Sequence, residues 1–307
     1  MRYIKQLVLR TLSRFDYQVI KVPRGDSILA ALTDKNAPLP ATANIVAVLP
    51  DIIRELQPND QPRLGGYQLE MATYDLKTVM GDVEPDFFPI FERCCKYSMT
   101  SWQRLYNLHA AVRYAVRTNI QGDFVECGVW RGGSMMMVAQ TLLALGCTDK
   151  RLFLFDTFEG LPKPDKTLDV DVWGHNAAEG WEMHRKTDQS SDWAYASLEE
   201  VRANMESTGY PMDNVFFIKG MVEDTLPAQA PDAISMLRLD TDWYQSTKHE
   251  MEVLYPRLSR NGVLILDDYG HFKGARQAVD EYFALRQDTA PLIVRVDYAG
   301  RMAIKIA

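Results

Sequence analysis

From residue 100 onward, short runs of apolar, β-forming residues alternate with stretches that have the periodicity of a helix. Such an alternation, with strands that are apolar throughout, is typical of a parallel sheet with helices on both faces. The last two strands are separated by only a few residues, too few for a crossover, so they should pair as an antiparallel hairpin. We therefore expect an α/β fold with a seven-stranded Rossmann-like sheet that is parallel except at its C-terminal end. The expected strands lie at residues 123–127, 151–155, 214–218, 233–239, 262–268, 292–296 and 301–307.

The composition of the chain argues against several classes of protein. The formal net charge is −7 and there is no long basic run, so attraction of the whole surface to nucleic acid is not expected. The four cysteines show neither CxxC spacing nor the density of a disulfide framework, which is typical of free thiols in a reducing compartment. No apolar run approaches the roughly 18–20 residues that span a bilayer, and no secretory signal peptide is apparent. These features favour a cytoplasmic enzyme.

The N-terminal part, residues 1–90, differs from the rest and is expected to be an extension of the main domain at 91–307. Residues 1–25 are rich in Lys and Arg and place apolar residues at helical spacing, which predicts a basic amphipathic helix. Such a helix either packs on its own domain or makes a weak contact with an anionic membrane surface, and the sequence leaves both open. Residues 33–65 contain several prolines and polar residues and are expected to be rich in loops.

A strand, a glycine-rich turn and the start of a helix follow one another at GDFVECGVWRGGS, residues 122–134. Glycines let a ligand approach the backbone closely, and the turn after a first strand is where open α/β sheets bind ligands. An acid at the end of the next strand is positioned to accept hydrogen bonds from ribose hydroxyls. Any strand–turn–helix unit favours glycine, however, and a strand-end acid is often only solvated. The candidate cofactor-binding residues here are Glu126, Gly128, Gly132, Ser134 and Asp156, and Ser134 is also expected to cap the helix.

Two further expected strands end in acids, at MLRLDTDWY and VLILDDYGHF. If these strands are neighbours, their carboxyl ends share one crevice, and the carboxylates would repel one another unless a cation lay among them. Oxygen ligands without a His or Cys cluster select Mg²⁺, with Mn²⁺ as an alternative. The second acidic pair could instead cap the helix that starts near residue 273. The candidate metal ligands are Asp240, Asp267 and Asp268, with Asp242 in reserve because it would share a strand face with Asp240.

A long insertion at residues 157–196 separates these two candidate sites and contains Trp173, Trp181 and Trp193. Loops of this length are uncommon unless they act as lids or binding loops. Exposed aromatic side chains above a polar site would suit stacking on a sugar ring or another flat apolar face. The alternative is a disordered surface loop, since the segment also carries many acids.

The runs VECGVWRGGS, LFDTFEGLP, LRLDTDWYQST and ARQAVDEYF occur in this order within roughly residues 90–307, and together they resemble the macrocin O-methyltransferase (TylF) family. The resemblance implies a class I methyltransferase fold, S-adenosyl-L-methionine and Mg²⁺ as cofactors, a homo-oligomer, and a hydroxyl of a sugar or related natural product or glycan as the substrate. It also implies that the glycine turn and Asp156 hold the cofactor and that the three candidate aspartates bind the metal. Thr241 departs from the glycine that the family commonly has at this position. Further cofactor contacts implied by the resemblance are Met99, Thr100, Gly220 and Met221.

Methyl transfer to a hydroxyl requires alignment of the two reactants and a group that accepts the proton. We expect Asp240 to be that acceptor, and His271, three residues after Asp268, is a second candidate. A lone histidine, however, is more often a surface or capping residue. Two other functions stay open: a metal-dependent glycosyltransferase, because residues 240–242 read DxD, and a non-catalytic binding protein that uses the basic N-terminal helix. The absence of GxGxxG argues against a nicotinamide oxidoreductase.

Overall fold

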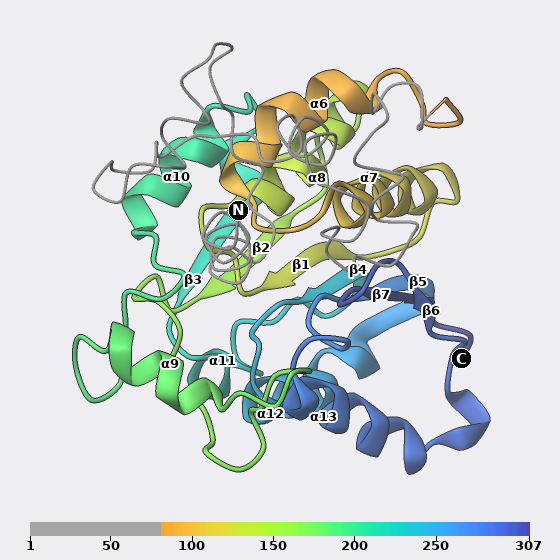
Figure 1. Ribbon diagram of the computed structural model, residues 1–307. Helices are drawn as coiled ribbons and strands as arrows, with labels where there is room; N and C mark the ends of the chain where they lie inside the picture. The colour runs from red at the N-terminus through yellow and green to blue at the C-terminus, as the bar shows by residue number, and fades with distance from the viewer. Residues whose placement is uncertain (1–80) are drawn as a thin grey trace, which may run out of the picture. The chain divides into compact units, whose positions relative to one another are not determined.

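A seven-stranded sheet forms the centre of the part of the chain that the structure, a computed structural model, describes, residues 81–307 (Figure 1). The strand order is β3-β2-β1-β4-β5-β7-β6. Neighbouring strands from β3 to β5 pair in parallel, whereas β7 is antiparallel to both β5 and β6. The predicted parallel sheet with an antiparallel C-terminal hairpin is therefore confirmed. The strands are β1 Asp123–Cys127, β2 Leu152–Asp156, β3 Val215–Lys219, β4 Ile234–Leu239, β5 Leu258–Leu266, β6 Val294–Arg295 and β7 Arg301–Ile304.

Helices cover both faces of this sheet, as expected (Figure 1). On one face α7 and α10 pack against α8, as does α6, while on the other α12 packs against α11 and α13. The α-helices are α6 Phe87–Cys94, α7 Trp102–Arg117, α8 Gly133–Ala144, α9 Ala177–His184, α10 Leu198–Glu206, α11 Val222–Thr225, α12 Tyr244–Val253 and α13 Lys273–Ala284. Short 3-10 turns are η2 Cys95–Tyr97, η3 Met212–Asn214, η4 Tyr255–Arg257 and η5 Gln287–Thr289.

The strand order reverses between β1 and β4, which lie side by side although β2 and β3 separate them in sequence. The chain leaves β1 toward one edge of the sheet and later returns to start β4 on the other side of β1. At such a reversal the loops after the two strands diverge and leave a crevice, which is where open α/β sheets bind ligands. This fold therefore directs attention to the residues that follow β1 and β4.

The helix α7 brings a polar N-terminus to this crevice. Ser101 is its N-cap and accepts a hydrogen bond from the Arg104 backbone N–H at 3.2 Å. The helix buries Leu105, Leu108 and Val112 in the core, in line with the periodicity of the sequence. The helix α7 contacts β4 and β5. Because its apolar face fixes the rotation of the helix, Arg104 in its first turn contacts Asp267, directly after β5.

Several of the expected strands differ in length from the observed ones, most clearly β5 and β6. The strand β5 starts at Leu258 and ends at Leu266, so Asp267 and Asp268 follow the strand rather than belonging to it. The strand β6 is only two residues long, and Leu292 before it is 82% exposed. The ends of these strands are therefore set by pairing with a neighbouring strand, since an apolar run in the sequence can continue beyond the last paired residue.

The insertion at residues 157–196 contains α9 and packs on the sheet domain. Trp181 is fully buried and its indole N–H donates to the Leu161 carbonyl at 2.9 Å. The buried Asp169 accepts from the Tyr244 backbone N–H at 2.8 Å, at the start of α12. The segment is packed structure held by these polar contacts, in contrast to a disordered surface loop.

Residues 86–307 form one compact unit. The expectations for residues 1–25 and 33–65 lie outside the described residues, as does most of the expected extension. None of the helices described between residues 81 and 307 combines the length and hydropathy that a membrane-spanning helix needs.

Candidate active site between β1 and β4

The glycine turn after β1 brings three backbone segments into contact. Gly128 has φ +82°, and a Cβ on it would lie 1.9 Å from the Asp240 carbonyl oxygen. A Cβ on Gly133 would lie 2.5 Å from the carbonyl of Tyr97. These two glycines allow the end of β4 and the segment before α7 to approach the turn. The sequence alone did not reveal that this close approach is why glycine is required there. Gly132, at φ +87°, is the N-cap of α8, so the expectation that Ser134 caps this helix is wrong.

The Asp156 carboxylate, at the end of β2, binds the backbone of the same turn. Its Oδ2 accepts from the N–H groups of Val129 at 2.6 Å and Trp130 at 3.1 Å. Its Oδ1 accepts from the Phe158 N–H at 2.7 Å. Asp156 thus organises the glycine turn. Because Oδ2 already accepts two N–H groups, a ligand donor would use the second lone pair of Oδ1, which the Thr157 hydroxyl approaches only at 3.5 Å. Its contact with ribose stays a prediction.

Gly220 and Met221, two of the residues implied by the resemblance, lie beside Asp156. The Gly220 backbone N–H donates to the Asp156 carbonyl at 3.0 Å, and Met221 is the N-cap of α11. Met99 and Thr100 directly precede the N-cap of α7, and the Thr100 hydroxyl lies 3.0 Å from that of Ser98. The fold therefore gathers the candidate cofactor residues at the carboxyl ends of the strands.

Glu126 on β1 has one carboxylate oxygen without a partner. Its side chain is fully buried, and its Oε1 accepts from Arg238 Nη1 at 2.5 Å. Its buried Oε2 has no hydrogen-bond partner among the described residues. Burial, opposed by Arg238, raises the pKa of Glu126 to about 7. A buried acceptor without a donor is costly, so this oxygen fits a donor supplied by a ligand, such as the ammonium group of S-adenosylmethionine.

Three aspartates converge after β4 and β5. Leu239 and Leu266, the last residues of these strands, are partners in the sheet, so the residues that follow them are neighbours. Asp240, Asp267 and Asp268 each offer a carboxylate oxygen, and these atoms lie within 4.8 Å of one another. The predicted convergence of these carboxylates is present, while their role as metal ligands stays a prediction. We call these three residues the aspartate cluster.

Two buried arginines partly neutralise this cluster. Arg238 Nη1 lies 2.8 Å from Asp240 Oδ2, and its Nη2 lies 2.6 Å from Asp267 Oδ1. Arg104 contacts the other oxygen of Asp267, and its Nε lies 3.0 Å from Asp297. Burial alone would raise the pKa of Asp267, but the two arginines hold that pKa below its ordinary value.

The other two aspartates of the cluster are less compensated, although Asp240 also contacts Arg238. Burial raises the pKa of Asp240 well above its ordinary value, against the effect of Arg238. Burial and the neighbouring Asp242 and Asp267 raise the pKa of Asp268 well above its ordinary value. Ionisation of all three carboxylates would leave negative charge in excess, which is why these pKa values are raised, and the cluster offers hard oxygen donors only. A divalent cation such as Mg²⁺ fits this donor set and would relieve the repulsion.

Asp242 does not join the cluster. The strand β4 ends at Leu239, and Asp242 has φ +66°, so the extended backbone on which its reserve role was based is wrong. Its backbone N–H donates to Asp268 Oδ2 at 3.3 Å. The capping alternative for the second acidic pair is also wrong, because Phe272 is the N-cap of α13 and no side chain caps this helix.

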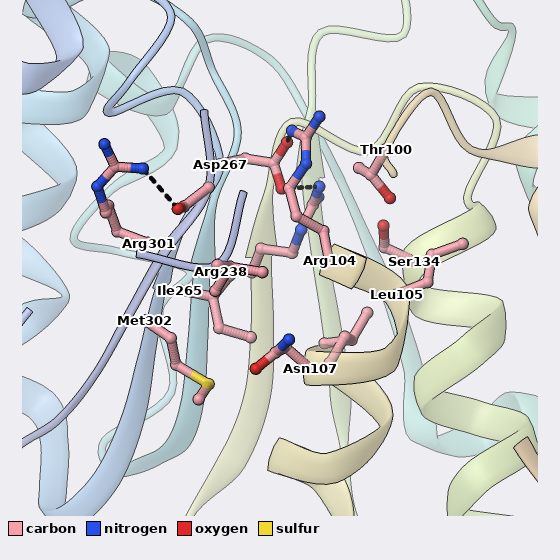
Figure 2. A pocket seen from close by; sticks show the side chains of 13 residues that line it. Thr100, Arg104, Leu105, Asn107, Ser134, Arg238, Ile265, Asp267, Arg301 and Met302 are labelled. Carbon is pink, nitrogen blue, oxygen red and sulfur yellow. Dashed lines mark hydrogen bonds and ion pairs between the residues drawn. The ribbon is translucent and has the colours of Figure 1, made fainter. Parts of the chain in front are cut away.

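A small pocket, partly open to solvent, lies between α7 and the strands β4, β5 and β7. Figure 2 shows Arg104 and Asp267 at its centre and the hydroxyl groups of Thr100 and Ser134 together on one side. Thr100, Arg104, Ser134, Arg238 and Asp267 all line it. Of the predicted residues, Thr100 and Ser134 from the cofactor set and Asp267 from the aspartate cluster thus share this pocket.

Neither arginine was among the residues predicted from the sequence. Arg238 had a signal, because it is a charged residue in the otherwise apolar and buried strand ISMLRL. An unpaired charge is not tolerated in such a place, so partners among the strand-end acids could have been expected. Arg104 had no such signal, since a first-turn arginine on an amphipathic helix is ordinarily solvated.

His271 lies close to the cluster through its backbone. Its N–H donates to the Asp268 carbonyl at 2.8 Å. Its Nδ1 lies 3.3 Å from the Tyr298 hydroxyl, and its ring contacts Trp173 and Phe272. The proposed role of His271 as a base stays a prediction.

Comparison with known proteins shows which family this chain matches. The family model described as Macrocin-O-methyltransferase (TylF) matches residues 90–303. The chain is 36% identical over 211 residues to the 8-demethyl-8-(2,3-dimethoxy-alpha-L-rhamnosyl)-tetracenomycin-C 4'-O-methyltransferase of Streptomyces olivaceus, covering 67% of this chain and 77% of that protein. It is 32% identical over 207 residues to the mycinamicin III 3''-O-methyltransferase of Micromonospora griseorubida, covering 66% and 76%. The solved structure of the O-methyltransferase NovP superposes with a TM-score of 0.60 at 31% identity, over 69% of this chain and 83% of that one.

Proposed function

The chain belongs to the macrocin O-methyltransferase family and is an O-methyltransferase, and from that premise we propose its cofactors and its class of substrate. S-adenosyl-L-methionine is the proposed methyl donor, and a divalent cation, Mg²⁺ before Mn²⁺, is the proposed metal. The proposed acceptor is a hydroxyl of a sugar, in keeping with the rhamnosyl group named for the relative from Streptomyces olivaceus.

The observation that carries this proposal is the position of the aspartate cluster beside Glu126, which has one carboxylate oxygen without a partner. Arg238 Nη1 contacts both Glu126 and Asp240, so the two carboxylates converge on one nitrogen of the same guanidinium. A cationic donor at Glu126 and a cation at the cluster would therefore be near neighbours. This is the arrangement that methyl transfer to a metal-bound hydroxyl requires, because the two reactants must be aligned.

In the proposed site, some side chains would bind the cofactor and another would accept the proton. Glu126 Oε2 would accept from the ammonium group of the cofactor, and Thr100 and Ser134 would supply hydroxyl groups beside it. Asp240 is the proposed proton acceptor, because its side chain is 27% exposed whereas that of Asp267 is 3% exposed and engaged by two arginines. A divalent cation held by the cluster would lower the pKa of an acceptor hydroxyl, which helps by several kcal/mol in known metal sites.

The two competing functions have less support. A DxD glycosyltransferase would use Asp242 together with Asp240 as metal ligands, but the carboxylate oxygens that converge are those of Asp240, Asp267 and Asp268. A non-catalytic binding protein would have no use for several buried carboxylates at one crevice, since each lowers stability unless it has a partner. The homo-oligomer and the membrane contact of residues 1–25 remain predictions.

The proposed function is tested by methyl transfer itself. Purified protein should bind S-adenosylhomocysteine in a calorimeter and should transfer labelled methyl groups from S-adenosylmethionine to a glycoside in the presence of Mg²⁺. Binding of a UDP-sugar in place of the adenosine ligand would contradict the proposal.

Asp156→Ala is expected to weaken S-adenosylhomocysteine binding by about 1–3 kcal/mol, since a charge-assisted acceptor is lost. The loss would include two backbone hydrogen bonds that hold the glycine turn and one to the loop after β2, so both binding enthalpy and affinity should fall. Isothermal titration calorimetry measures this. Asp188→Ala is the control, because that side chain is 83% exposed and contacts only Arg185. An unchanged dissociation constant for Asp156→Ala would refute the assignment.

A further inference from the structure

Trp173 in the insertion is exposed in a way that the neighbouring tryptophans are not. It is 60% exposed, whereas Trp181 is fully buried and Trp243 is 3% exposed. The indole N–H groups of Trp181 and Trp243 donate to the carbonyls of Leu161 and Pro162. No hydrogen bond of the Trp173 indole is found within residues 81–307. The large apolar face of Trp173 therefore contributes little to the core, so its presence at this position needs a reason other than core packing.

Trp173 lies beside two further rings. Its ring centroid is 5.5 Å from that of His271, at an interplanar angle of 75°, and 6.5 Å from that of Tyr298, at 31°. We call Trp173, His271 and Tyr298 the aromatic wall. Its three residues come from the insertion, the loop after β5 and the turn between β6 and β7, so only the fold brings them together.

The aromatic wall is linked to the aspartate cluster through two sets of contacts. The His271 backbone N–H donates to the Asp268 carbonyl at 2.8 Å. On the other side, Asp297 precedes Tyr298 and binds Arg104, which also contacts Asp267. The wall and the cluster are therefore joined through two short chains of contacts. One runs through Asp268, and the other runs through Arg104 and Asp267.

The backbone holds the wall in place. The Gly270 N–H donates to the Ala299 carbonyl at 2.8 Å, and a Cβ on Gly270 would lie 2.0 Å from the Tyr298 carbonyl oxygen. The Asp171 carboxylate accepts from the Trp173 backbone N–H at 2.9 Å. Asp171 also pairs with Phe272 in a β-bridge, which ties the insertion to the loop after β5. The wall is thus positioned before any ligand arrives.

We propose that the aromatic wall is the acceptor-binding subsite, with the apolar face of a pyranose ring stacked on the Trp173 indole. A pyranose has C–H groups on its faces and hydroxyls on its edge, so it suits an indole face next to a polar cluster. A sugar stacked on Trp173 directs an edge hydroxyl to Asp240 and its neighbours. The assignment rests on the proposed function, because it places the acceptor of that same reaction.

The test uses fluorine NMR of protein labelled with 5-fluorotryptophan, with methyl α-L-rhamnopyranoside as the probe. The chain has six tryptophans, and the resonance absent from Trp173→Phe is that of Trp173. In the presence of S-adenosylhomocysteine and Mg²⁺, addition of the sugar should shift this resonance while those of the buried Trp181 and Trp243 stay in place.

Variants then measure the contribution of the ring. Trp173→Ala should raise the dissociation constant of the rhamnoside roughly tenfold, whereas Trp173→Phe, which keeps an aromatic face, should change it by about threefold or less. Met183→Ala is the matched control, because Met183 is in the same insertion and is 80% exposed. Affinity for S-adenosylhomocysteine should be the same in all of these variants.

The outcomes separate this inference from the proposed function. If wild-type protein binds no S-adenosylhomocysteine, the proposed function fails, and the acceptor subsite fails with it. If it binds S-adenosylhomocysteine and Mg²⁺ but the Trp173 resonance does not respond to the sugar, only the subsite is wrong. Rhamnoside binding by Trp173→Ala at wild-type affinity would also overturn it. In these last two cases Trp173 would instead be a candidate contact for another protein.

Discussion

Asp240→Asn is expected to reduce kcat by on the order of 10³-fold while S-adenosylhomocysteine binding stays within about threefold of wild type. Asp240 supplies one of the three oxygens of the aspartate cluster and is the proposed proton acceptor. An asparagine keeps the size of the side chain and its contact with Arg238, but it removes the negative charge and the capacity to take a proton. Steady-state methyl transfer at saturating Mg²⁺ and cofactor measures the loss.

The control for this prediction is Asp188→Asn, in the insertion. The Asp188 side chain is 83% exposed and pairs with Arg185, so this variant should keep most of the wild-type rate. Removal of metal with EDTA should reproduce the loss in wild-type protein, and added Mg²⁺ should restore activity. Full activity of both Asp240→Asn and EDTA-treated protein would show that the cluster binds no catalytic metal.

Gly128→Ala is expected to lower the free energy of unfolding by about 3–5 kcal/mol, or to prevent folding altogether. Alanine is strained at φ +82°, and its Cβ would lie 1.9 Å from the Asp240 carbonyl oxygen, which is backbone and cannot move aside. The end of β1 or that of β4 would have to shift, so the turn and the aspartate cluster would be disturbed together. Urea denaturation gives the free energy, and the soluble yield reports a failure to fold.

Gly146→Ala separates the two causes of this loss. Gly146 also has a positive φ, +68°, but nothing lies within 4 Å of its added Cβ. It should therefore cost only the backbone strain, about 1–2 kcal/mol. If the two variants were equally stable, the close approach of β1 and β4 would not be the reason that position 128 requires glycine.

Local patterns in the sequence were sufficient for the architecture and for the position of the candidate site. Strand–helix alternation predicted the parallel sheet, and the short final connection predicted the antiparallel hairpin. The aspartates could be grouped because parallel strands place their carboxyl ends at one edge, so that a strand-end acid is located by the strand alone. Asp240, Asp267 and Asp268 were found in this way.

Only the tertiary structure decided which charges and rings meet around these aspartates. Arg104 reaches Asp267 from α7, more than 160 positions away in the chain, and Arg238 links Asp267 to Glu126 on β1. Trp173 and Tyr298 meet His271 from two other segments. A strand or helix pattern repeats within a few residues and can be read locally, whereas the direction of a side chain and its partner across the sheet depend on the packing of the whole domain.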